Sequence, residues 1–374
     1  MVHLPGRIVA GAAAAAALAT LVAPVLPAHA APAASGRVVA SGLDNPRQLS
    51  IGPAGAVYVA EAGRGGPGPC IPNPDDPTSE NCLGPTGAVT KIARGAQERV
   101  VEGLPSLAGT GGSSAQGPGD VAVTGNHIAV VIGFGGAPDA RATLGEGGAL
   151  LGTVVAGRIG GSLAKVADPL AYEAAQNPHP AQLDTNPTGL LARGRSGKYL
   201  VVDAGANDLL QVGKREATVA VFPDRMATAP WGATLPMQSV PTDVVEGPDG
   251  AFYVSELTGF PFPVGGSVVW RVVPGQEPTV YASGLTNVTA LDWRGDTLYA
   301  VQLSDAGLLN GVVGSLRRVV PGATKHPVVA GGLFAPYGVA IHGGTAYVST
   351  CTIAADPIPG ACPDGGEVRA FALR

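Results

Sequence analysis

Val38-Val39-Ala40-Ser41-Gly42-Leu43, close to the start of the chain, has the same pattern as Val280-Tyr281-Ala282-Ser283-Gly284-Leu285, which ends a repeat further along. The last repeat lacks this element, because the chain ends after the apolar run Glu367–Ala372 and two more residues. We therefore predict that residues 38–43 form the outermost strand of the last sheet, beside Glu367–Ala372. Such closure removes the unpaired sheet edges that would otherwise pair with another chain.

One pattern recurs along the sequence. Each copy starts at a marker residue (46, 118, 187, 241, 288 or 336) and continues as two apolar runs joined by a glycine turn. Two further β-branched runs follow, as in Ser267–Val272 and Thr279–Ala282. A period of about 45 residues with four strands is typical of a β-propeller. The sequence predicts an all-β fold: a six-bladed β-propeller of four-stranded blades, closed by the N-terminal strand.

The composition excludes several classes of protein. Of 374 residues, 45% are hydrophobic and 14% charged, which is too apolar for an intrinsically disordered chain. The formal net charge is −5 and no basic cluster occurs, so we expect no nucleic-acid partner. The 56 glycines and 34 prolines disfavour long helices and favour a turn-rich β-protein.

The first thirty residues have the features of a secretory signal. Arg7 precedes the apolar run Ala10–Val22, and Ala28-His29-Ala30 places small residues where a signal peptidase cleaves. The run is too short to span a bilayer of about 30 Å, and no later run is long enough. We expect a signal peptide at 1–30, a propeller domain at 31–374, and a secreted protein without a membrane span.

If the protein is exported, its four cysteines are expected to form disulfides, because disulfides form in oxidising compartments. Cys70 and Cys82 lie in one loop, and Cys351 and Cys362 lie in another. Four cysteines allow three pairings. We favour Cys70–Cys82 and Cys351–Cys362 because these loops are short. A zinc site is the alternative, but no C-x-x-C pair or nearby histidine supports it.

Insertions are concentrated in the connections at one end of the predicted blades. They lie between the second and third strands, as at 62–87 and 257–265, or between blades, as at 168–185. The turns between first and second strands are short. Function usually lies on loops held by a rigid scaffold, so we expect it on this loop-rich face. The segment 168–176 is the expected helix, capped by Asp168 and started by Pro169.

Several segments resemble the ScyD/ScyE family of secreted, propeller-like proteins. They are Leu170-Ala171-Tyr172-Glu173-Ala174-Ala175, Asn186-Pro187, the run 202–210, Val219-Ala220-Val221-Phe222-Pro223, and the run 256–265, which is the most specific. The resemblance extends from about Gly36 to the C-terminus. It implies a six-bladed propeller and export, without an established activity to transfer. The loop of Cys70 and Cys82 departs from the family pattern.

Polar residues at the strand ends are expected to ring the channel mouth on the loop-rich face. The candidate ligand-binding residues of this ring are Asn45, Glu61, Asn186, Asp203, Glu256, Asn287 and Gln302. Glu61, Asp203 and Glu256 offer the hard oxygens that Ca²⁺ prefers, as in calcium-dependent lactonases and esterases with six blades. The structural interpretation is that each acid caps backbone N–H groups of the following turn.

Phe260 and Phe262 are further candidates, because each precedes a proline and could project from the loop-rich face. Alternatively they cover the channel mouth. We expect Trp231, Trp270 and Trp293 in the core between blades. The histidines offer no triad for nucleophilic catalysis. The favoured function is an exported, monomeric binding scaffold for a small molecule, polysaccharide or protein, with no cofactor; the alternative is a calcium-dependent lactonase or esterase.

Overall fold

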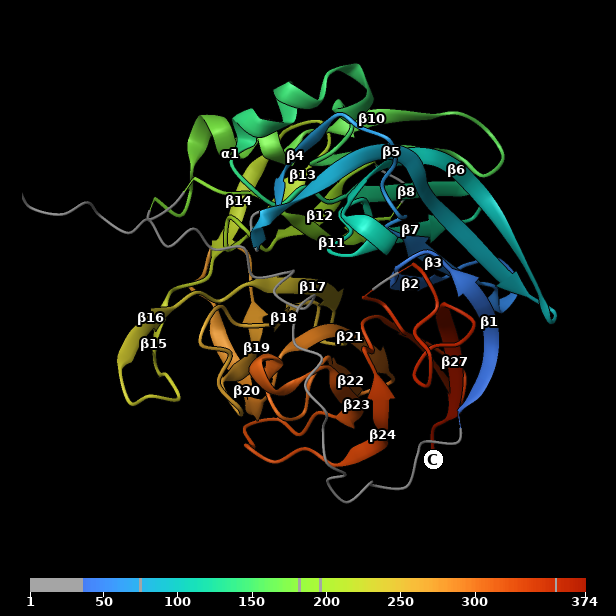
Figure 1. The fold of residues 1–374 in the computed structure, drawn as a ribbon. Helices are drawn as coiled ribbons and strands as arrows, with labels where there is room; N and C mark the ends of the chain where they lie inside the picture. The colour runs from blue at the N-terminus through green and yellow to red at the C-terminus, as the bar shows by residue number, and fades with distance from the viewer. Residues whose placement is uncertain (1–35, 74–75, 181–182, 195–196, 354) are drawn as a thin grey trace, which may run out of the picture.

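The computed structural model describes residues 36–73, 76–180, 183–194, 197–353 and 355–374, so the predicted signal peptide lies outside the described residues. Within them the chain forms five four-stranded sheets, one five-stranded sheet and one two-stranded sheet, all antiparallel (Figure 1). The fold is a β-propeller, and its prediction as an all-β protein is confirmed.

Four of the sheets use four strands that are consecutive in the chain. These are β7 (Pro118–Thr124), β8 (His127–Ile132), β9 (Thr153–Arg158) and β10 (Leu163–Ala167); β11 (Pro187–Ala192), β12 (Tyr199–Asp203), β13 (Asp208–Val212) and β14 (Ala217–Val221); β17 (Pro241–Glu246), β18 (Phe252–Glu256), β19 (Ser267–Val272) and β20 (Thr279–Leu285); and β21 (Val288–Arg294), β22 (Thr297–Gln302), β23 (Val313–Arg318) and β24 (Val328–Phe334).

The five-stranded sheet comes first in the chain. It joins β2 (Pro46–Ile51), β3 (Val57–Glu61), β5 (Asp76–Ala93) and β6 (Ala96–Ala108), and the short β4 (Cys70–Asn73) also pairs with β5. The marker residues 46, 118, 187, 241 and 288 are the first residues of β2, β7, β11, β17 and β21, and the marker residue 336 lies three residues before the strand Val339–His342.

The remaining four-stranded sheet joins the two ends of the chain. It contains β25 (Val339–His342), β26 (Thr345–Thr350), β27 (Gly366–Ala372) and, at its edge, β1 (Arg37–Leu43). Val38 pairs with Arg369 and Ala40 with Val368, so the predicted closure by the N-terminal strand is confirmed (Figure 1).

Neighbouring sheets pack face to face through shared apolar cores. In β18, Phe252 and Val254 face the preceding sheet, whereas Tyr253 faces the following one. This alternation buries both faces of a strand and explains why the strands are continuous apolar runs. A further core unites Ala40 of β1 with Leu49 of β2, so the last sheet also packs on the first.

The first strands of the sheets surround the axis of the propeller. β2, β7, β11, β17, β21 and β25 contact one another in this order, and β25 contacts β2. Buried or partly buried aspartates link several of these strands. Asp243 of β17 accepts a hydrogen bond from Leu291 N of β21 at 2.8 Å, and Asp292 of β21 accepts one from Ile341 N of β25 at 2.6 Å. These bonds fix one sheet against the next.

The connections carry additional elements. The helix α1 (Pro169–Gln176) is capped by Asp168, which accepts a hydrogen bond from Ala171 N at 3.1 Å, as predicted. The hairpin of β15 (Arg225–Thr228) and β16 (Thr234–Met237) was not predicted. The short 3-10 helices are η1 (Pro53–Gly55), η2 (Thr110–Gly112), η3 (Pro138–Leu144), η4 (Glu146–Gly148) and η5 (Leu308–Asn310).

Both predicted disulfides are confirmed. Cys70 is bonded to Cys82, which joins β4 to β5, and Cys351 is bonded to Cys362 in the connection between β26 and β27. All four cysteines lie within the described residues, and none of them is free. Each bond closes a short loop at the end of the strands where the long connections lie.

Candidate functional site

Glu61, the last residue of β3, is fully buried and forms an ion pair. Arg99 of β6 donates to its two carboxylate oxygens, at 3.1 Å to Oε1 and 2.7 Å to Oε2. Thr90 Oγ1 and Asp44 N also donate to it, at 2.5 and 2.8 Å. These contacts compensate the buried charge. The hydrogen bond to Glu61 raises the pKa of Arg99, and the negative charges of Glu61 and Asp44 add to that rise.

Glu256, the last residue of β18, is the corresponding group three sheets further on. It is also fully buried, and Arg225 of the unpredicted hairpin donates to its Oε1. Ser239 Oγ and Trp270 Nε1 donate to Oε2, each at 2.8 Å. The carboxylate therefore fixes the hairpin to the propeller.

Asp203, at the end of β12, accepts hydrogen bonds mainly from backbone N–H groups. Asn186 N, Gly205 N and Ala206 N donate to Oδ1 at 2.6, 3.0 and 3.0 Å, and Thr185 Oγ1 donates to Oδ2 at 2.6 Å. This is the capping role considered from the sequence. Burial raises the pKa of Asp203 and the hydrogen bonds oppose that rise.

Asn45 and Asn287 both start a first strand in the left-handed backbone conformation, with φ of 54° and 46°, which asparagine tolerates better than most residues. Asn45 Nδ2 donates to the carbonyl oxygens of Gly63 and Gly112 at 2.9 and 2.8 Å. Asn287 Nδ2 donates to Leu257 O at 2.9 Å. These amides connect the loops of neighbouring sheets.

Gln302 and Asn186 complete the predicted ring. Gln302 is buried at the end of β22, accepts from Thr286 N at 3.0 Å and donates to Asp305 Oδ1 at 2.6 Å. Asn186 is partly exposed, and its backbone N–H is the group bound by Asp203. All seven residues thus lie at the same end of the strands. The side chains of all of them except Asn186 form the hydrogen bonds within the protein that are described above.

Apolar side chains of the long connections pack together at the end of the sheets where the seven candidate residues lie. They belong to connections of four successive sheets and form one cluster: Ala204, Val240, Leu257, Leu303, Val312 and Ala335. Within the described residues, no three His, Cys, Asp or Glu side chains form a group that could hold a metal ion.

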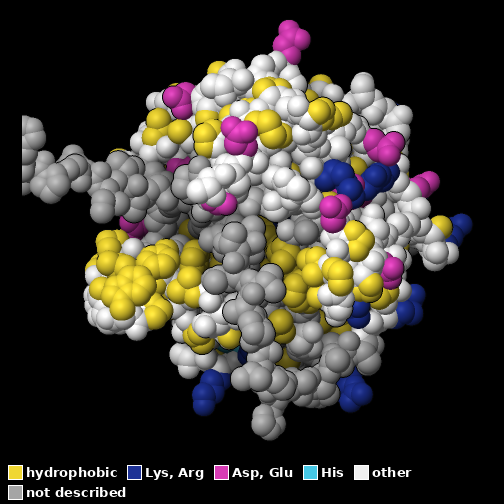
Figure 2. Space-filling model, in the orientation of Figure 1, with side chains coloured by type: hydrophobic (Ala, Val, Ile, Leu, Met, Phe, Trp, Pro, Cys, Tyr) yellow, Lys and Arg dark blue, Asp and Glu magenta, His cyan; other side chains and the backbone are white. Residues whose placement is uncertain are grey.

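An exposed aromatic surface lies beside this cluster. Trp231, at the tip of the hairpin, is 65% exposed and stacks on Phe260, which is 44% exposed, with ring centroids 5.7 Å apart. Phe262 contacts Phe260 edge-on at 6.0 Å and is buried. Met226 and Val264 are exposed as well. The four exposed residues and the Phe262 ring that supports Phe260 form what we call the aromatic surface. Figure 2 shows hydrophobic side chains gathered over β15 and β16.

The prediction for Trp231 was wrong, whereas Trp270 is buried as expected. Trp231 belongs to a hairpin outside the four-stranded sheets, so the repeat carries no information about it. The sequence Pro230-Trp231-Gly232 is a turn signal that could have placed this tryptophan on a loop.

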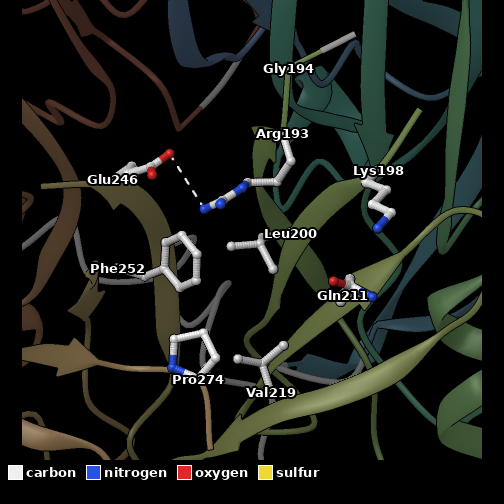
Figure 3. A pocket seen from close by; sticks show the side chains of 9 residues that line it. All are labelled: Arg193, Gly194, Lys198, Leu200, Gln211, Val219, Glu246, Phe252 and Pro274. Atoms are coloured by element: carbon white, nitrogen blue, oxygen red, sulfur yellow. Dashed lines mark ion pairs between the residues drawn. The ribbon is translucent and has the colours of Figure 1, made fainter. Parts of the chain in front are cut away.

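A groove of about 460 Å³ lies between the third sheet and the following one (Figure 3). Leu200 and Phe252 form its floor, and Arg193 crosses it to Glu246 at 3.4 Å while its guanidinium lies 4.7 Å from the Phe252 ring centre. Lys198 lines the other side. The groove lies at the end of the short turns, so it contains none of the predicted site residues.

Four buried carboxyl groups on and near α1 influence one another electrostatically, and only Asp203 among them was a candidate from the sequence. The others are Glu173 of α1, Asp184 and Asp208, the first residue of β13, and all four are buried. Burial raises the pKa of Glu173 to about 8, and the negative charges of Asp203 and Asp184 add to that rise. Burial also raises the pKa of Asp208, with added repulsion from Asp203 and Glu173.

Comparison with solved structures supports the fold. A protein of unknown function from Dyadobacter fermentans DSM 18053 aligns with 91% of this chain and 99% of its own, at 13% identity and a TM-score of 0.50. A catalytically inactive virginiamycin B lyase from Staphylococcus aureus with quinupristin aligns over 91% and 99%, at 10% identity and 0.41. A putative oxidoreductase (glucose dehydrogenase) from Thermus thermophilus aligns over 90% and 100%, at 14% identity and 0.34.

At these identities the likeness concerns the fold alone. No protein-family model matches the sequence, and no curated protein is significantly similar to it. None of the described helices is long and apolar enough to cross a membrane. Both the arrangement of the sheets and the comparison with solved structures thus support a propeller fold.

Proposed function

We propose that the chain is an exported, six-bladed propeller that binds its ligand through the aromatic surface. The ring of first strands, β2 to β25, in which each contacts the next, supports a count of six blades. The hairpin β15–β16 is then an added element between two blades. Two disulfides, the expected signal peptide and the resemblance to ScyD/ScyE proteins support export.

The observation that carries the proposed function is the exposure of Trp231 and Phe260 on a fixed base. Large aromatic side chains are usually buried, so two stacked and exposed rings are unusual. Their orientation is fixed before binding, because Phe262 supports Phe260 and the Arg225–Glu256 ion pair holds the hairpin. Preordered aromatic rings lose little conformational entropy on binding.

Flat aromatic faces suit ligands that have apolar faces of their own. Of the ligand classes expected from the sequence, a polysaccharide fits this surface best, because sugar rings present C–H groups that pack on an aromatic ring. Neither ring offers a charged group, so we expect binding to vary little with salt concentration.

The test compares Trp231→Ala and Phe260→Ala with Val280→Ala, a control at another exposed apolar residue. Each protein is incubated with a panel of insoluble and soluble polysaccharides, and the bound fraction is measured. We expect either aromatic substitution to weaken binding about tenfold or more and the control to leave it unchanged. Equal binding by all four proteins, or binding by none of them, would overturn the proposal.

The calcium-dependent lactonase or esterase stays a prediction. Its expected ligands Glu61 and Glu256 are paired with arginines, and Asp203 is bound by backbone N–H groups. A metal ion there would have to displace these partners.

A further inference from the structure

Asp208 is an unusual residue of the third sheet, independent of the aromatic surface. Its side chain is 0% exposed, and neither carboxylate oxygen has a hydrogen-bond partner in the part of the chain that the structure describes. A buried polar group without a partner costs several kcal/mol, and a buried charge costs more. A buried carboxyl group of this kind either stays protonated, as the raised pKa of Asp208 indicates, or is ionised beside a positive charge that compensates it.

The direction of the Asp208 side chain follows from strand register. Asp208 of β13 is paired directly with Asp203 of β12, and paired residues place their side chains on the same face of a sheet. Glu173 of α1 lies on that side as well, since its charge and that of Asp203 both act on Asp208. Asp208 thus points into the space between the sheet and α1.

Two other strand ends show how this protein normally compensates a buried acid. Glu61 is paired with Arg99, and Glu256 is paired with Arg225. Asp203 stands at the corresponding place in the third sheet, but its compensation comes from N–H and O–H groups. Within the described residues, neither Asp203 nor Asp208 forms an ion pair with a basic side chain. The arginine that pairs with Glu61 or Glu256 thus has no counterpart at Asp203 and Asp208 among the residues that the structure describes.

We propose that Asp208 and Glu173 bind a divalent cation, with Ca²⁺ as the best fit, between β13 and α1. Two carboxylates match its charge, and backbone carbonyl oxygens and water complete the set of hard oxygen ligands that Ca²⁺ takes. This site needs only two acidic side chains, so it is compatible with the finding that no three His, Cys, Asp or Glu side chains among the described residues lie close enough together to hold one ion. The bound ion fixes α1 on the sheet.

The experiment measures thermal unfolding of the full mature protein, treated with chelator and then given CaCl₂, alongside calorimetric titration of CaCl₂. For a dissociation constant one hundredth of the free calcium concentration, we expect the Tm of the wild type to rise by about 4 °C. Asp208→Asn and Glu173→Gln should each abolish this rise and the binding heat. Glu61→Gln and Glu256→Gln are the controls and should retain both.

Three results would overturn the proposal. The first is a wild-type protein whose Tm and heat of titration do not respond to CaCl₂. The second is a response retained by Asp208→Asn or Glu173→Gln. The third is a response lost in both controls and retained by Asp208→Asn, which would place the ion at the channel mouth. If Asp208→Asn does not fold, the Glu173→Gln variant and the titration of the wild type still show whether Ca²⁺ binds beside α1.

Discussion

Replacing Arg225 by methionine should destabilise the protein and release the hairpin that carries Trp231. Arg225 donates to Glu256 and, at 2.9 Å, to Gly266 O, and its guanidinium lies 5.9 Å from the Trp270 ring centre. Methionine keeps much of the apolar stem and removes the charge. Glu256 then stays buried as a carboxylate with only neutral partners.

The magnitude follows from this loss. Removing one partner of a buried ion pair costs about 3–5 kcal/mol. The Arg225 side chain is 30% exposed, so water can replace part of the lost interaction, and we expect a loss of about 2–3 kcal/mol. Adding Glu256→Gln removes the uncompensated charge, so the double variant should recover about 1–2 kcal/mol of that loss.

Urea denaturation followed by tryptophan fluorescence measures these free energies, and hydrogen exchange of residues 225–237 reports whether the hairpin opens. Glu256→Gln alone is the matched control for the double variant. A loss below about 0.5 kcal/mol for Arg225→Met, or a double variant no more stable than the single one, would refute the reasoning.

Three further predictions concern the closure of the propeller, one disulfide and the partly buried Asp292. Leu43→Ala, in β1, should cost about 3 kcal/mol in urea denaturation because Leu43 is buried where the ends of the chain meet; a loss under about 1 kcal/mol would contradict this closure. Replacing Cys351 and Cys362 by serine should cost about 3 kcal/mol, and an unchanged unfolding midpoint would show that the bond does not constrain the unfolded chain. Burial raises the pKa of Asp292 from 3.8 to about 6, so its contribution to stability is complete below pH 4 and is lost as the pH rises through 6. That loss is about 3 kcal/mol, and an Asp292→Asn variant with the same pH profile of stability as the wild type would disprove it.

The sequence was sufficient to predict the fold because the relevant information is periodic and local. Apolar runs bounded by glycine and proline located the strands, and the match between residues 38–43 and 280–285 located the closing strand. The disulfides followed from loop length, since Cys70–Cys82 and Cys351–Cys362 each join residues in one connection. These features depend on neighbours along the chain or on the repeat.

The partners of the candidate residues could not be predicted, because they depend on contacts between distant segments. Arg99 lies 38 residues from Glu61, and Arg225 lies 31 residues from Glu256. Arg99 lies in the last strand of the same sheet as Glu61, but the insertion at 62–87 separates the two residues along the chain. Arg225 comes from an added hairpin outside the repeat. Trp231 was misplaced for the same reason.

The strand-end acids also explain how the added segments are held. Glu61 fixes Arg99 of the long hairpin β5–β6, Glu256 fixes Arg225 of the hairpin β15–β16, and Asp203 lies beneath α1. A buried carboxylate at the end of a second strand binds strongly to whatever donor covers it, because little water competes. Different segments can therefore be attached at one position of the repeat, provided that each brings a compensating charge. The first two segments bring an arginine, whereas α1 brings Glu173, and this difference is the reason to look for a cation beside Asp208.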